Sequence, residues 1–514
     1  MVILKKQELL LAEKFFQKGK YEDVIQFIND IEQKEKLSSV EKLTFNLLKG
    51  SAMVMLGQYD ETFSLAEQLI QESQKLGKKL HTIDALILKA KSLYWLRKID
   101  DGLKIIEQGE RLLKTITDKS SFEIKQRKAW IAWGKGVSYM EKGEYDLQLK
   151  NLEKGLKLGE ETGIKQIAFF CLMLLGNYYT YVKGDFNRAL RYLNRSLEVA
   201  RSMQNQLNTA WSISILVSIY YKRGELDICV KYIKQAYSLF KKTNNKIHGT
   251  SMLNYLGAIY LDKGEFSRAS RYLERTFAIY EKIGDSNRIC IVLTDLIFLA
   301  LEKSDFELSN FYFNYLKRLN KKENNIKFVS LEYKFNKAMI FKKDPQQINL
   351  SKAKALLEQI INEESVDLSL YTLALLELCD ILIINLKATN DLKLIDVIRP
   401  ILNKVIEITK KTQSYWLLTE TYLLQAKLEL VTLDLNEAQL SLDKAYQTAE
   451  KFGLKLLILR ILDEKDELEK QFTLWENFKS SQAIIAERIY LAHIDNQLVR
   501  MLRKRLSLEK IVFN

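Results

Sequence analysis

Apolar residues recur along this chain at the spacing of one helix face, and short breaks separate the apolar runs. After Gly184, for example, Ala189, Leu193 and Leu197 lie four residues apart. Apolar positions at intervals of three and four residues form one stripe along an α-helix, whereas a half-buried strand alternates at every second residue. The pattern therefore predicts a succession of amphipathic helices.

The breaks between these helices recur with a nearly constant period. A phrase of glycine, an acidic residue and an apolar residue begins at Gly143, Gly184, Gly224 and Gly264, which lie 41, 40 and 40 residues apart. Glycine adopts positive φ without steric cost, so we expect a tight turn at each position. The same phase passes through Gly19, Gly57, Arg97 and Ser304, and more weakly through Ile348, Asn390 and Leu433.

Two further sets of glycines keep this period. One set lies inside the predicted helices, where glycine costs about 1 kcal/mol relative to alanine and therefore implies the close approach of another helix. Its members are Gly50, Gly136, Gly176 and Gly257. The other set is expected at helix C-caps, where a left-handed residue ends the helix. Its members are Gly77, Gly163, Gly284 and Gly453, with Asn244 and Asn324 in the same phase.

Each period predicts a hairpin of two helices, and the hairpins must stack because one alone cannot bury its apolar face. The region around Gly257 resembles a tetratricopeptide repeat (TPR) in its order of small, large and turn residues, which are Leu256, Gly257, Tyr260, Gly264, Phe266 and Ala269. The resemblance, to the longer TPR variant of scaffold and adaptor proteins, covers Lys5 to Asn325 and Ser414 to Gly453. Three positions depart from the TPR pattern: Arg97 and Ser304, which stand at turn positions, and Gln148, which stands where a small residue is expected.

The predicted fold is all-α: a right-handed α-solenoid of about eleven stacked TPR-like helical hairpins with a helical C-terminal cap. We expect eight hairpins in residues 1–325, two degenerate hairpins in 326–412, a final hairpin in 413–453 and the cap in 454–514. The cap should consist of two amphipathic helices, residues 454–472 and 481–506.

Only two prolines occur in the chain, and both lie where the repeat fades. Pro345 falls among extra residues at the turn of the ninth hairpin. Pro400 falls inside the second helix of the tenth hairpin, where it should kink or restart the helix because it lacks a backbone N–H. We therefore predict that the solenoid bends or repacks between Ile326 and Thr412.

Charge and cysteine content bear on the partners and the cellular compartment of the protein rather than on its fold. Lys and Arg number 79 against 65 Asp and Glu, a formal charge of +14, which favours acidic partners, although an evenly solvated surface explains it as well. The four cysteines lie far apart in the sequence, each within an apolar helical segment. They are therefore predicted to be buried free thiols in a cytoplasmic protein. They are Cys171, Cys229, Cys290 and Cys379. Charged residues interrupt the apolar N-terminal stretch and residues 372–386, so we expect neither a signal peptide nor a membrane span.

No pattern in the sequence points to catalysis. The three histidines, His81, His248 and His493, lie far apart, and no metal-ligand spacing, phosphate-binding loop or nucleophile elbow occurs. The prediction is a protein that is not an enzyme, with no cofactor and no metal.

The TPR resemblance implies where a partner would bind. In such solenoids the first helix of each hairpin lines a concave groove, and positions 6 and 3 before the mid-helix glycine, and 1 and 4 after it, face that groove. Aromatic residues there can anchor a partner, and asparagine amides can bond a peptide backbone. The candidate groove residues are Trp130, Trp133, Asn177, Trp211, Tyr221 and Asn254. The alternative is that the aromatic residues pack between neighbouring hairpins.

A second candidate surface is a basic ridge on the second helices. Two triplets spaced i, i+3, i+7 each lie on one helix face, and could hold phosphates or an acidic partner. They are Arg188, Arg191 and Arg195, and Arg268, Arg271 and Arg275. The alternative is a solvated convex face whose arginines pair with neighbouring carboxylates. The basic C-terminal residues Arg500, Arg503, Lys504 and Arg505 likewise suit either an anionic surface or a polar cap.

These features favour a cytoplasmic interaction scaffold or adaptor that binds a peptide or helix segment in the groove of a TPR-like solenoid. The alternative is a nucleic-acid-associated or signalling regulatory protein that uses its basic surface, although no nucleic-acid-binding motif supports it. The sequence leaves open the partner's identity and the oligomeric state.

Overall fold

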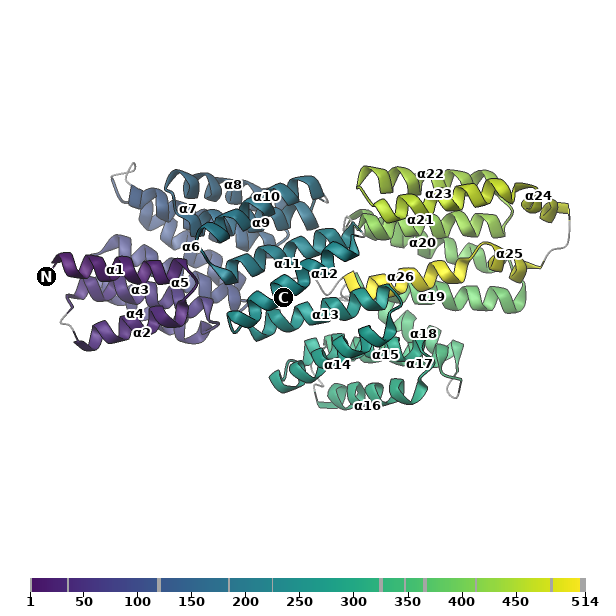
Figure 1. Cartoon of the computed structure of the whole chain (residues 1–514), viewed down its shortest axis with the longest axis horizontal. Helices are drawn as coiled ribbons and strands as arrows, with labels where there is room; N and C mark the ends of the chain where they lie inside the picture. The colour runs from purple at the N-terminus through teal and green to yellow at the C-terminus, as the bar shows by residue number, and fades with distance from the viewer. Residues whose placement is uncertain are drawn as a thin grey trace. The chain divides into compact units, whose positions relative to one another are not determined.

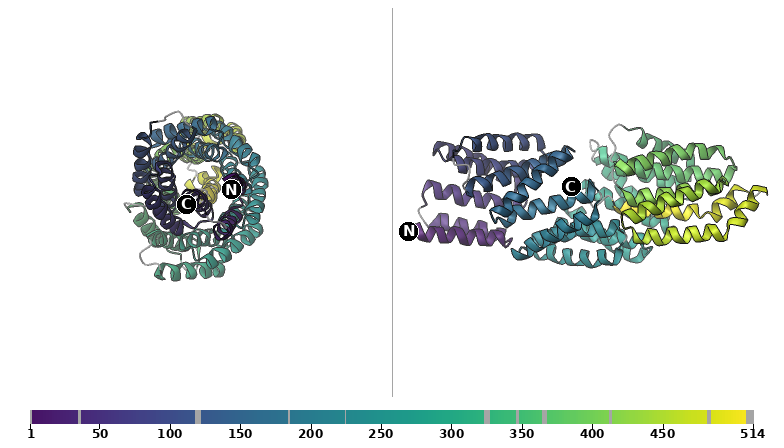
Figure 2. Two further views of the ribbon diagram at one scale, coloured as in Figure 1. Left: turned by 90° about the vertical axis from the view of Figure 1, so that its left-hand side faces the viewer. Right: turned by 90° about the horizontal axis from the view of Figure 1, so that it is seen from above.

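The computed structural model describes residues 2–34, 37–117, 122–183, 185–223, 225–322, 327–345, 348–363, 368–411, 414–480 and 484–508. These residues form 26 helices and no strand (Figure 1). The chain divides into two compact units, Met1–Ile215 (unit 1) and Leu216–Asn514 (unit 2). The helices of each unit lie side by side (Figure 2), so the predicted all-α repeat architecture is confirmed.

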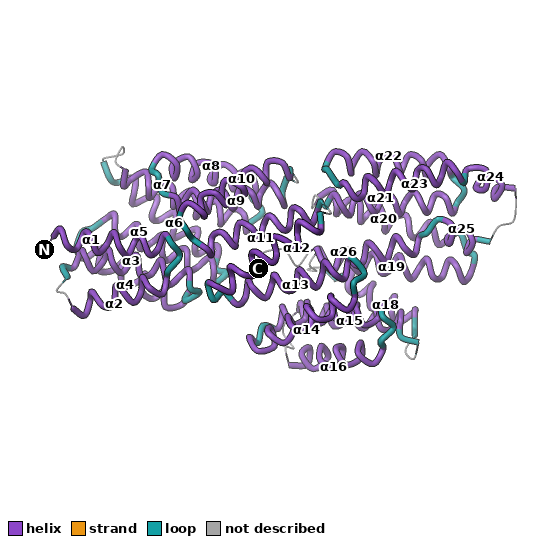
Figure 3. The backbone as a smooth tube through the Cα atoms, viewed as in Figure 1, coloured by secondary structure: helices purple, strands orange, loops and turns teal. Residues whose placement is uncertain are grey.

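The helices pair into hairpins in chain order, joined by short loops (Figure 3). The hairpins of unit 1 are α1 (Val2–Gln17) with α2 (Tyr21–Lys34), α3 (Ser39–Met55) with α4 (Tyr59–Lys75), α5 (Lys79–Trp95) with α6 (Ile99–Lys114), α7 (Phe122–Glu141) with α8 (Tyr145–Glu161), and α9 (Lys165–Tyr181) with α10 (Phe186–Ser202). Helix α11 (Gln206–Lys222) passes from unit 1 into unit 2 and pairs with α12 (Leu226–Lys242).

Unit 2 continues the same pairing and then departs from it. Its further hairpins are α13 (Lys246–Asp262) with α14 (Phe266–Ile283), α15 (Ser286–Glu302) with α16 (Phe306–Lys322), α17 (Lys327–Lys343) with α18 (Leu350–Ile361), α19 (Leu368–Thr389) with α20 (Lys393–Lys411), and α21 (Tyr415–Val431) with α22 (Leu435–Lys451). The four helices that follow are α23 (Lys455–Lys470), α24 (Phe472–Ser480), α25 (Ile485–Leu491) and α26 (Ile494–Leu508).

The predicted turns have the expected left-handed backbone, including several that lack glycine. Gly143 and Gly264 have φ of 71° and 72°. A non-glycine residue in this region carries a steric cost, so its presence shows that the repeat geometry imposes the turn. The non-glycine turn residues are Arg97 (61°), Ser304 (57°), Asn390 (55°) and Leu433 (63°). Gly184, Gly224 and Asn324 lie outside the described residues, and Ile348 does not adopt positive φ.

The mid-helix glycines mark close contacts with a second helix, which is the partner helix of the same hairpin at Gly136, Gly176 and Gly257 and helix α5 of the next hairpin at Gly50. A Cβ added at Gly176 would lie 2.5 Å from Leu193 Cγ, and one added at Gly257 would lie 2.6 Å from Leu273 Cδ2. Distances this short cannot be tolerated without movement of a core leucine. The predicted close approach of a second helix at this phase is therefore confirmed.

First helices and second helices have different surroundings. First helices of successive hairpins pack against one another, as α5 does against α3 and α7, and as α15 does against α13 and α17. The structure records no comparable packing between successive second helices among the described residues. In a curved stack the elements that lie closer together are on the inner side. We call the first-helix side the inner face of each unit, and the second-helix side its outer face.

Unit 1 is closed by a contact between its first hairpin and the loop before α11. The buried Asn205 amide donates hydrogen bonds to the carbonyl oxygen of Gln17 (3.1 Å) and to the hydroxyl of Tyr21 (3.2 Å). A Cβ at Gly19 would lie 2.7 Å from Asn205 Oδ1. A side chain at this turn would therefore crowd the Asn205 amide. Burial raises the pKa of Tyr21. The first hairpin is thus tied to a segment about 185 residues later.

The inner face of unit 2 contacts the end of the chain. Helix α26 packs against α13, α19 and α21, and α25 packs against α19 and α21. In the end-on view, the yellow C-terminal helix lies inside the teal and green helices of unit 2 (Figure 2, left). Helices α13, α19 and α21 are all first helices of their hairpins, so α26 lies on the inner face.

The structure corrects two predictions about local helix geometry. Helix α20 runs without interruption through Pro400, so the predicted restart does not occur. Pro400 is exposed, and the buried Ile398 and Leu402 on either side hold the helix by packing despite the missing N–H. The two predicted C-terminal helices are four, because α23 ends at Lys470 before α24, and His493 has a φ of 51° between α25 and α26.

Candidate functional site

The inner face of unit 1 carries a cluster of three half-buried aromatic residues. Trp130 and Trp133 lie on α7 with ring centroids 5.6 Å apart. Phe170 on α9 contacts both, with centroid separations of 6.2 Å and 5.7 Å. The two tryptophans are one helical turn apart and therefore share one face of α7. The cluster joins two successive first helices, and each of its three residues is only partly buried.

A lysine lies over this aromatic cluster. Lys91 of α5 places Nζ 3.4 Å from the ring centroid of Trp130 and 5.9 Å from that of Trp133. In the described part of the chain, no carboxylate lies within ion-pair distance of this ammonium group. Burial lowers the pKa of Lys91 to about 7, with a smaller opposing effect from Asp84. The indole face thus replaces a carboxylate as the neighbour of the cation.

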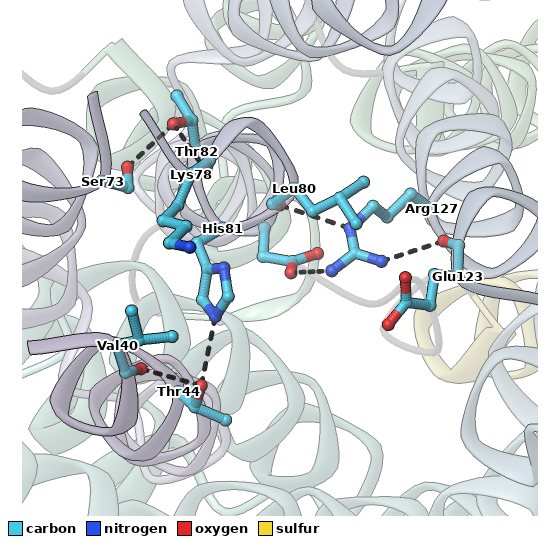
Figure 4. A network of polar contacts seen from close by, with 10 residues as sticks. Val40, Thr44, Ser73, Lys78, Leu80, His81, Thr82, Glu123 and Arg127 are labelled. Atoms are coloured by element: carbon cyan, nitrogen blue, oxygen red, sulfur yellow. Dashed lines mark hydrogen bonds and ion pairs between the residues drawn. The ribbon is translucent and has the colours of Figure 1, made fainter. Parts of the chain in front are cut away.

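Two turns earlier on α5, Asp84 forms an ion pair with Arg127 of α7. The Arg127 guanidinium also donates to the carbonyl oxygens of Leu80 (3.3 Å) and Glu123 (2.9 Å). Burial raises the pKa of Asp84 to about 6, and Arg127 opposes that rise. Figure 4 shows Arg127 between Leu80 and Glu123, with the ring of His81 directed at Thr44 of α3 (3.1 Å).

Several buried polar atoms of unit 1 have no hydrogen-bond partner within the described residues. Trp133 Nε1, a donor, and Asn177 Oδ1, an acceptor, belong to residues of the inner face. Gln166 Nε2 and Asn208 Oδ1 are a second donor and acceptor, and these two side chains also contact each other at 3.5 Å. Buried polar groups are normally paired, so unpaired donors and acceptors along one face identify a surface suited to a polar ligand.

The structure separates the predicted groove residues into two groups. Trp130, Trp133 and Asn177 are half-buried residues of unit 1, and the two tryptophans belong to one cluster. Trp211, Tyr221 and Asn254 are only 8%, 2% and 5% exposed, which leaves little surface for a partner. The first group therefore defines the candidate site.

Comparison with known proteins agrees with this architecture. The tetratricopeptide repeat family model matches residues 250–283, the hairpin of α13 and α14. One hairpin of this chain thus matches the tetratricopeptide repeat, and the remaining hairpins share its all-helical repeat architecture. No curated protein sequence matches the chain. The match falls on the region where Gly257, Tyr260 and Ala269 carry the sequence resemblance.

Several solved structures are similar to this chain. The apo form of the quorum sensor NprR from B. thuringiensis is 12% identical, covers 71% of this chain and 100% of its own, and has a TM-score of 0.53. A Rap protein complexed with Competence and Sporulation Factor is 14% identical over 70% and 97% of the two chains, with a TM-score of 0.46. Yeast Tom70 is 14% identical over 93% and 99%, with a TM-score of 0.39. At 12% identity, the likeness to NprR concerns the fold alone.

The six arginines of the predicted basic ridge are exposed on the outer helices α10 and α14. Arg195 pairs with Glu160, Arg188 with Asp185 and Arg268 with Glu265. The guanidinium groups of Arg271 and Arg275 lie over the rings of Tyr272 and Tyr237, at 5.3 Å and 5.8 Å from the centroids. These contacts match the alternative of a solvated outer face with local partners. Helix α10 belongs to unit 1 and α14 to unit 2.

Sequence reasoning did not identify Asp84, Lys91 or Arg127. The groove positions were indexed on a mid-helix glycine, and the third hairpin has Ala90 at that phase. Counting from Ala90, the same rule places Asp84 six residues before it and Lys91 one residue after it. A repeat index based on any small residue would have found both. Arg127 lies beyond the indexed positions, and only its contact with Asp84 brings it into the site.

The remaining chemical predictions concern cysteine, metal and membrane. All four cysteines are free and buried, as predicted. Among the described residues, no group of three or more His, Cys, Asp or Glu side chains could hold a metal ion. None of the helices in the described part of the chain combines the length and hydrophobicity needed to cross a membrane.

Proposed function

We propose that this TPR-type protein is a non-catalytic interaction scaffold and that the inner face of unit 1 binds an extended peptide or short helix of a partner protein. The observation that carries the proposal is the aromatic cluster with unpaired polar atoms beside it. Trp130, Trp133 and Phe170 offer anchoring surface, while Trp133 Nε1 and Asn177 Oδ1 offer one donor and one acceptor. An extended peptide presents both complementary groups on its backbone.

The charge of the site favours a ligand that carries a carboxylate next to its anchoring residue. Among the described residues, no carboxylate lies within ion-pair distance of Lys91, which lies over Trp130. A carboxylate that reached it would be shielded from water by the two indole rings. The formal charge of +14 supports the same preference at longer range. The relative NprR, which this chain resembles in fold, is described as a quorum sensor. The proposal here rests on the residues of this chain.

The test begins with peptides selected from a random display library on the full-length protein. The affinity of a selected peptide is then measured by fluorescence polarisation for the native chain and for Trp133→Ala. Loss of an aromatic anchor at a binding centre should weaken binding by about 2 kcal/mol, or roughly 30-fold. Trp95→Ala is the matched control, because Trp95 is half exposed at the end of α5 and stacks on Tyr59, outside the cluster. Equal loss in both variants, or in neither, would count against the site.

Nucleic-acid binding through the outer arginines is the alternative, and the local partners of Arg188, Arg195 and Arg268 do not favour it. The two functions respond differently to salt. Binding that neutralises phosphates weakens steeply between 50 and 200 mM salt, by a factor of about 10³ for six contacts, whereas peptide binding through aromatic anchors changes little. The affinity of the full chain for an RNA or DNA duplex is therefore measured across this salt range. Tight binding that weakens steeply with salt would contradict the scaffold proposal and support nucleic-acid binding.

A further inference from the structure

The second unit already holds a helix on its inner face, and this helix comes from the same chain. The buried face of α26 consists of Ile494, Leu498, Met501 and Leu502, none of which is more than 3% exposed. These residues lie at i, i+4, i+7 and i+8, so they form one stripe along the helix. The stripe faces α13, α19 and α21, the first helices of three hairpins.

Polar contacts fix the position of α26 on this surface. The side-chain amide of Gln497 donates to the carbonyl oxygen of Glu420 (3.0 Å) and to its carboxylate (2.5 Å). Gln497 and Glu420 are both fully buried. Asp495 forms an ion pair with Lys387 of α19. A glutamine amide bonded to a backbone carbonyl and a buried carboxylate sets the register of the helix more sharply than apolar packing alone.

Two buried charges of α21 on the receiving surface, Glu420 and Lys427, keep their partners without α26. Arg460 of α23 donates to the Glu420 carboxylate at 2.5 Å, and Glu464 of α23 pairs with the buried Lys427 of α21. Release of α26 would therefore leave both of these buried pairs intact, and Lys387, which loses Asp495, is partly exposed and would gain water in its place. On α26 itself, Asp495 and Gln497 would regain water. The main cost of release is the renewed exposure of one apolar stripe, which another helix of the same pattern could cover.

The free form of α26 has little stability of its own. It is 15 residues long, and an isolated helix of this length is marginal in water. Its order thus depends on the surface that holds it, as with a ligand that folds on binding.

We propose that α26 is an exchangeable intramolecular ligand of the inner face of unit 2, and that an amphipathic helix of a partner protein displaces it. The partner helix carries apolar residues at i, i+4, i+7 and i+8, an amide-bearing residue at i+3 to reach Glu420, and an acidic residue at i+1 to reach Lys387. The bound α26 keeps this surface closed until such a helix competes with it. The inference concerns unit 2 and does not rest on the function proposed for unit 1.

The test uses a fluorescein-labelled synthetic peptide with the sequence of residues 484–508 as the probe. Its affinity is measured for the native full-length chain and for the double variant Leu498→Asp, Met501→Asp, which cannot seat its own helix. We expect the variant to bind the probe at least tenfold more tightly, because the internal competitor has gone. Asn496→Asp is the control chain, since Asn496 is exposed on the same helix, and it should behave like the native protein.

Two outcomes would overturn the proposal. The first is equal affinity of the probe for the native and the double-variant chains, or binding that persists when the probe itself carries both aspartates. The second is independent of any variant: hydrogen exchange on the native protein should show α26 amides opening faster than those of α21. If both helices exchange only through global unfolding, α26 is a permanent part of the core. This second measurement also decides the matter if circular dichroism shows that the double variant has lost helicity.

Discussion

The inner faces of the two units differ in how their buried lysines are paired. In unit 1, Lys91 lies over two indole rings and faces no carboxylate at ion-pair distance within the described residues. In unit 2, Lys342 of α17 pairs with Glu377 and Asp380 of α19, and Lys427 pairs with Glu464. Unit 2 also has a helix docked on its inner face. The same repeat architecture thus leaves a lysine without a carboxylate partner among the described residues on the inner face of unit 1, whereas the buried lysines on the inner face of unit 2 are paired.

This contrast teaches that stacking of hairpins fixes the backbone of the inner face but not its chemistry. The first helices of both units pack against one another in the same way. The side chains at their inner positions then decide whether the surface satisfies itself or requires a ligand. Substitutions of matched residues in the two units should therefore have opposite effects.

The largest expected effect is the loss of Lys342. The variant Lys342→Met leaves Glu377 buried without its counter-charge, and we expect the free energy of unfolding of this region to fall by about 3–5 kcal/mol. Hydrogen exchange of α17 and α19 amides in urea measures the loss locally. Lys327→Met is the control, because Lys327 pairs with Glu363 at the surface of the same helix and should cost less than about 1 kcal/mol. If both variants lost a similar free energy of unfolding, the buried ion pair would be no more important to stability than the exposed one.

The next effect concerns the docked helix. Gln497→Ala removes both hydrogen bonds to Glu420, one of them to a charged group, and should destabilise α26 by about 1–3 kcal/mol. Faster hydrogen exchange of α26 amides, with α22 unchanged, is the expected readout. Asn496→Ala alters the exposed side of the same helix and should leave exchange as it was, so a change there would indicate general loss of helicity.

Lys91→Met should have the opposite sign to Lys342→Met and should stabilise unit 1, on the order of 1 kcal/mol near pH 6. The pKa of Lys91 is lowered to about 7 from 10.5, so between these values the unfolded chain holds a proton that the folded chain lacks. The free energy of unfolding of the native protein therefore rises with pH across this window. The advantage of the variant is largest below pH 7 and shrinks toward pH 10.

Thermal unfolding of the native protein and Lys91→Met at pH 6 and pH 9.5 measures this difference. Lys89→Met, two residues away on α5, is the control because Lys89 forms an ion pair with Glu67. A pH-independent gain for Lys91→Met, or any gain for the control, would show that the unpaired charge is not the cause.

The smallest effect is expected on the outer face. Arg195 and Glu160 form an ion pair with both side chains about half exposed, and Arg195→Ala should change stability by no more than about 1 kcal/mol. A double-mutant cycle with Glu160→Ala isolates the pair. A coupling energy well above this value would mean that the outer arginines form a more organised surface than their exposure indicates.

The repeat could be derived from the sequence because each turn, cap and close contact recurs at a fixed phase. Even the turns at Arg97 and Ser304 were located without a glycine, since the neighbouring periods determined the phase. Helix α20 was predicted less well, because the packing of Ile398 and Leu402 outweighs the local effect of Pro400.

The position of α26 had no comparable signal. Its amphipathic pattern shows that Leu498 and Met501 need a partner surface, but the pattern does not say which one. Stacking favours contact with the nearest hairpin, whereas α26 contacts α13, more than 230 residues earlier in the chain. Likewise, nothing in the local sequence around Lys91 reveals that Trp130, on the next hairpin, takes the place of a carboxylate.

The bond between Asn205 and Tyr21 has a consequence for biosynthesis. Its two ends are 184 residues apart, and a ribosome adds roughly 5–20 residues per second, so the first hairpin emerges on the order of ten to forty seconds before its closing partner exists. During that interval the hairpin can stack on its immediate successors but cannot form the contact around Gly19. The N-terminal end of the nascent chain therefore becomes fully native only when nearly all of unit 1 has been made, although it is made first.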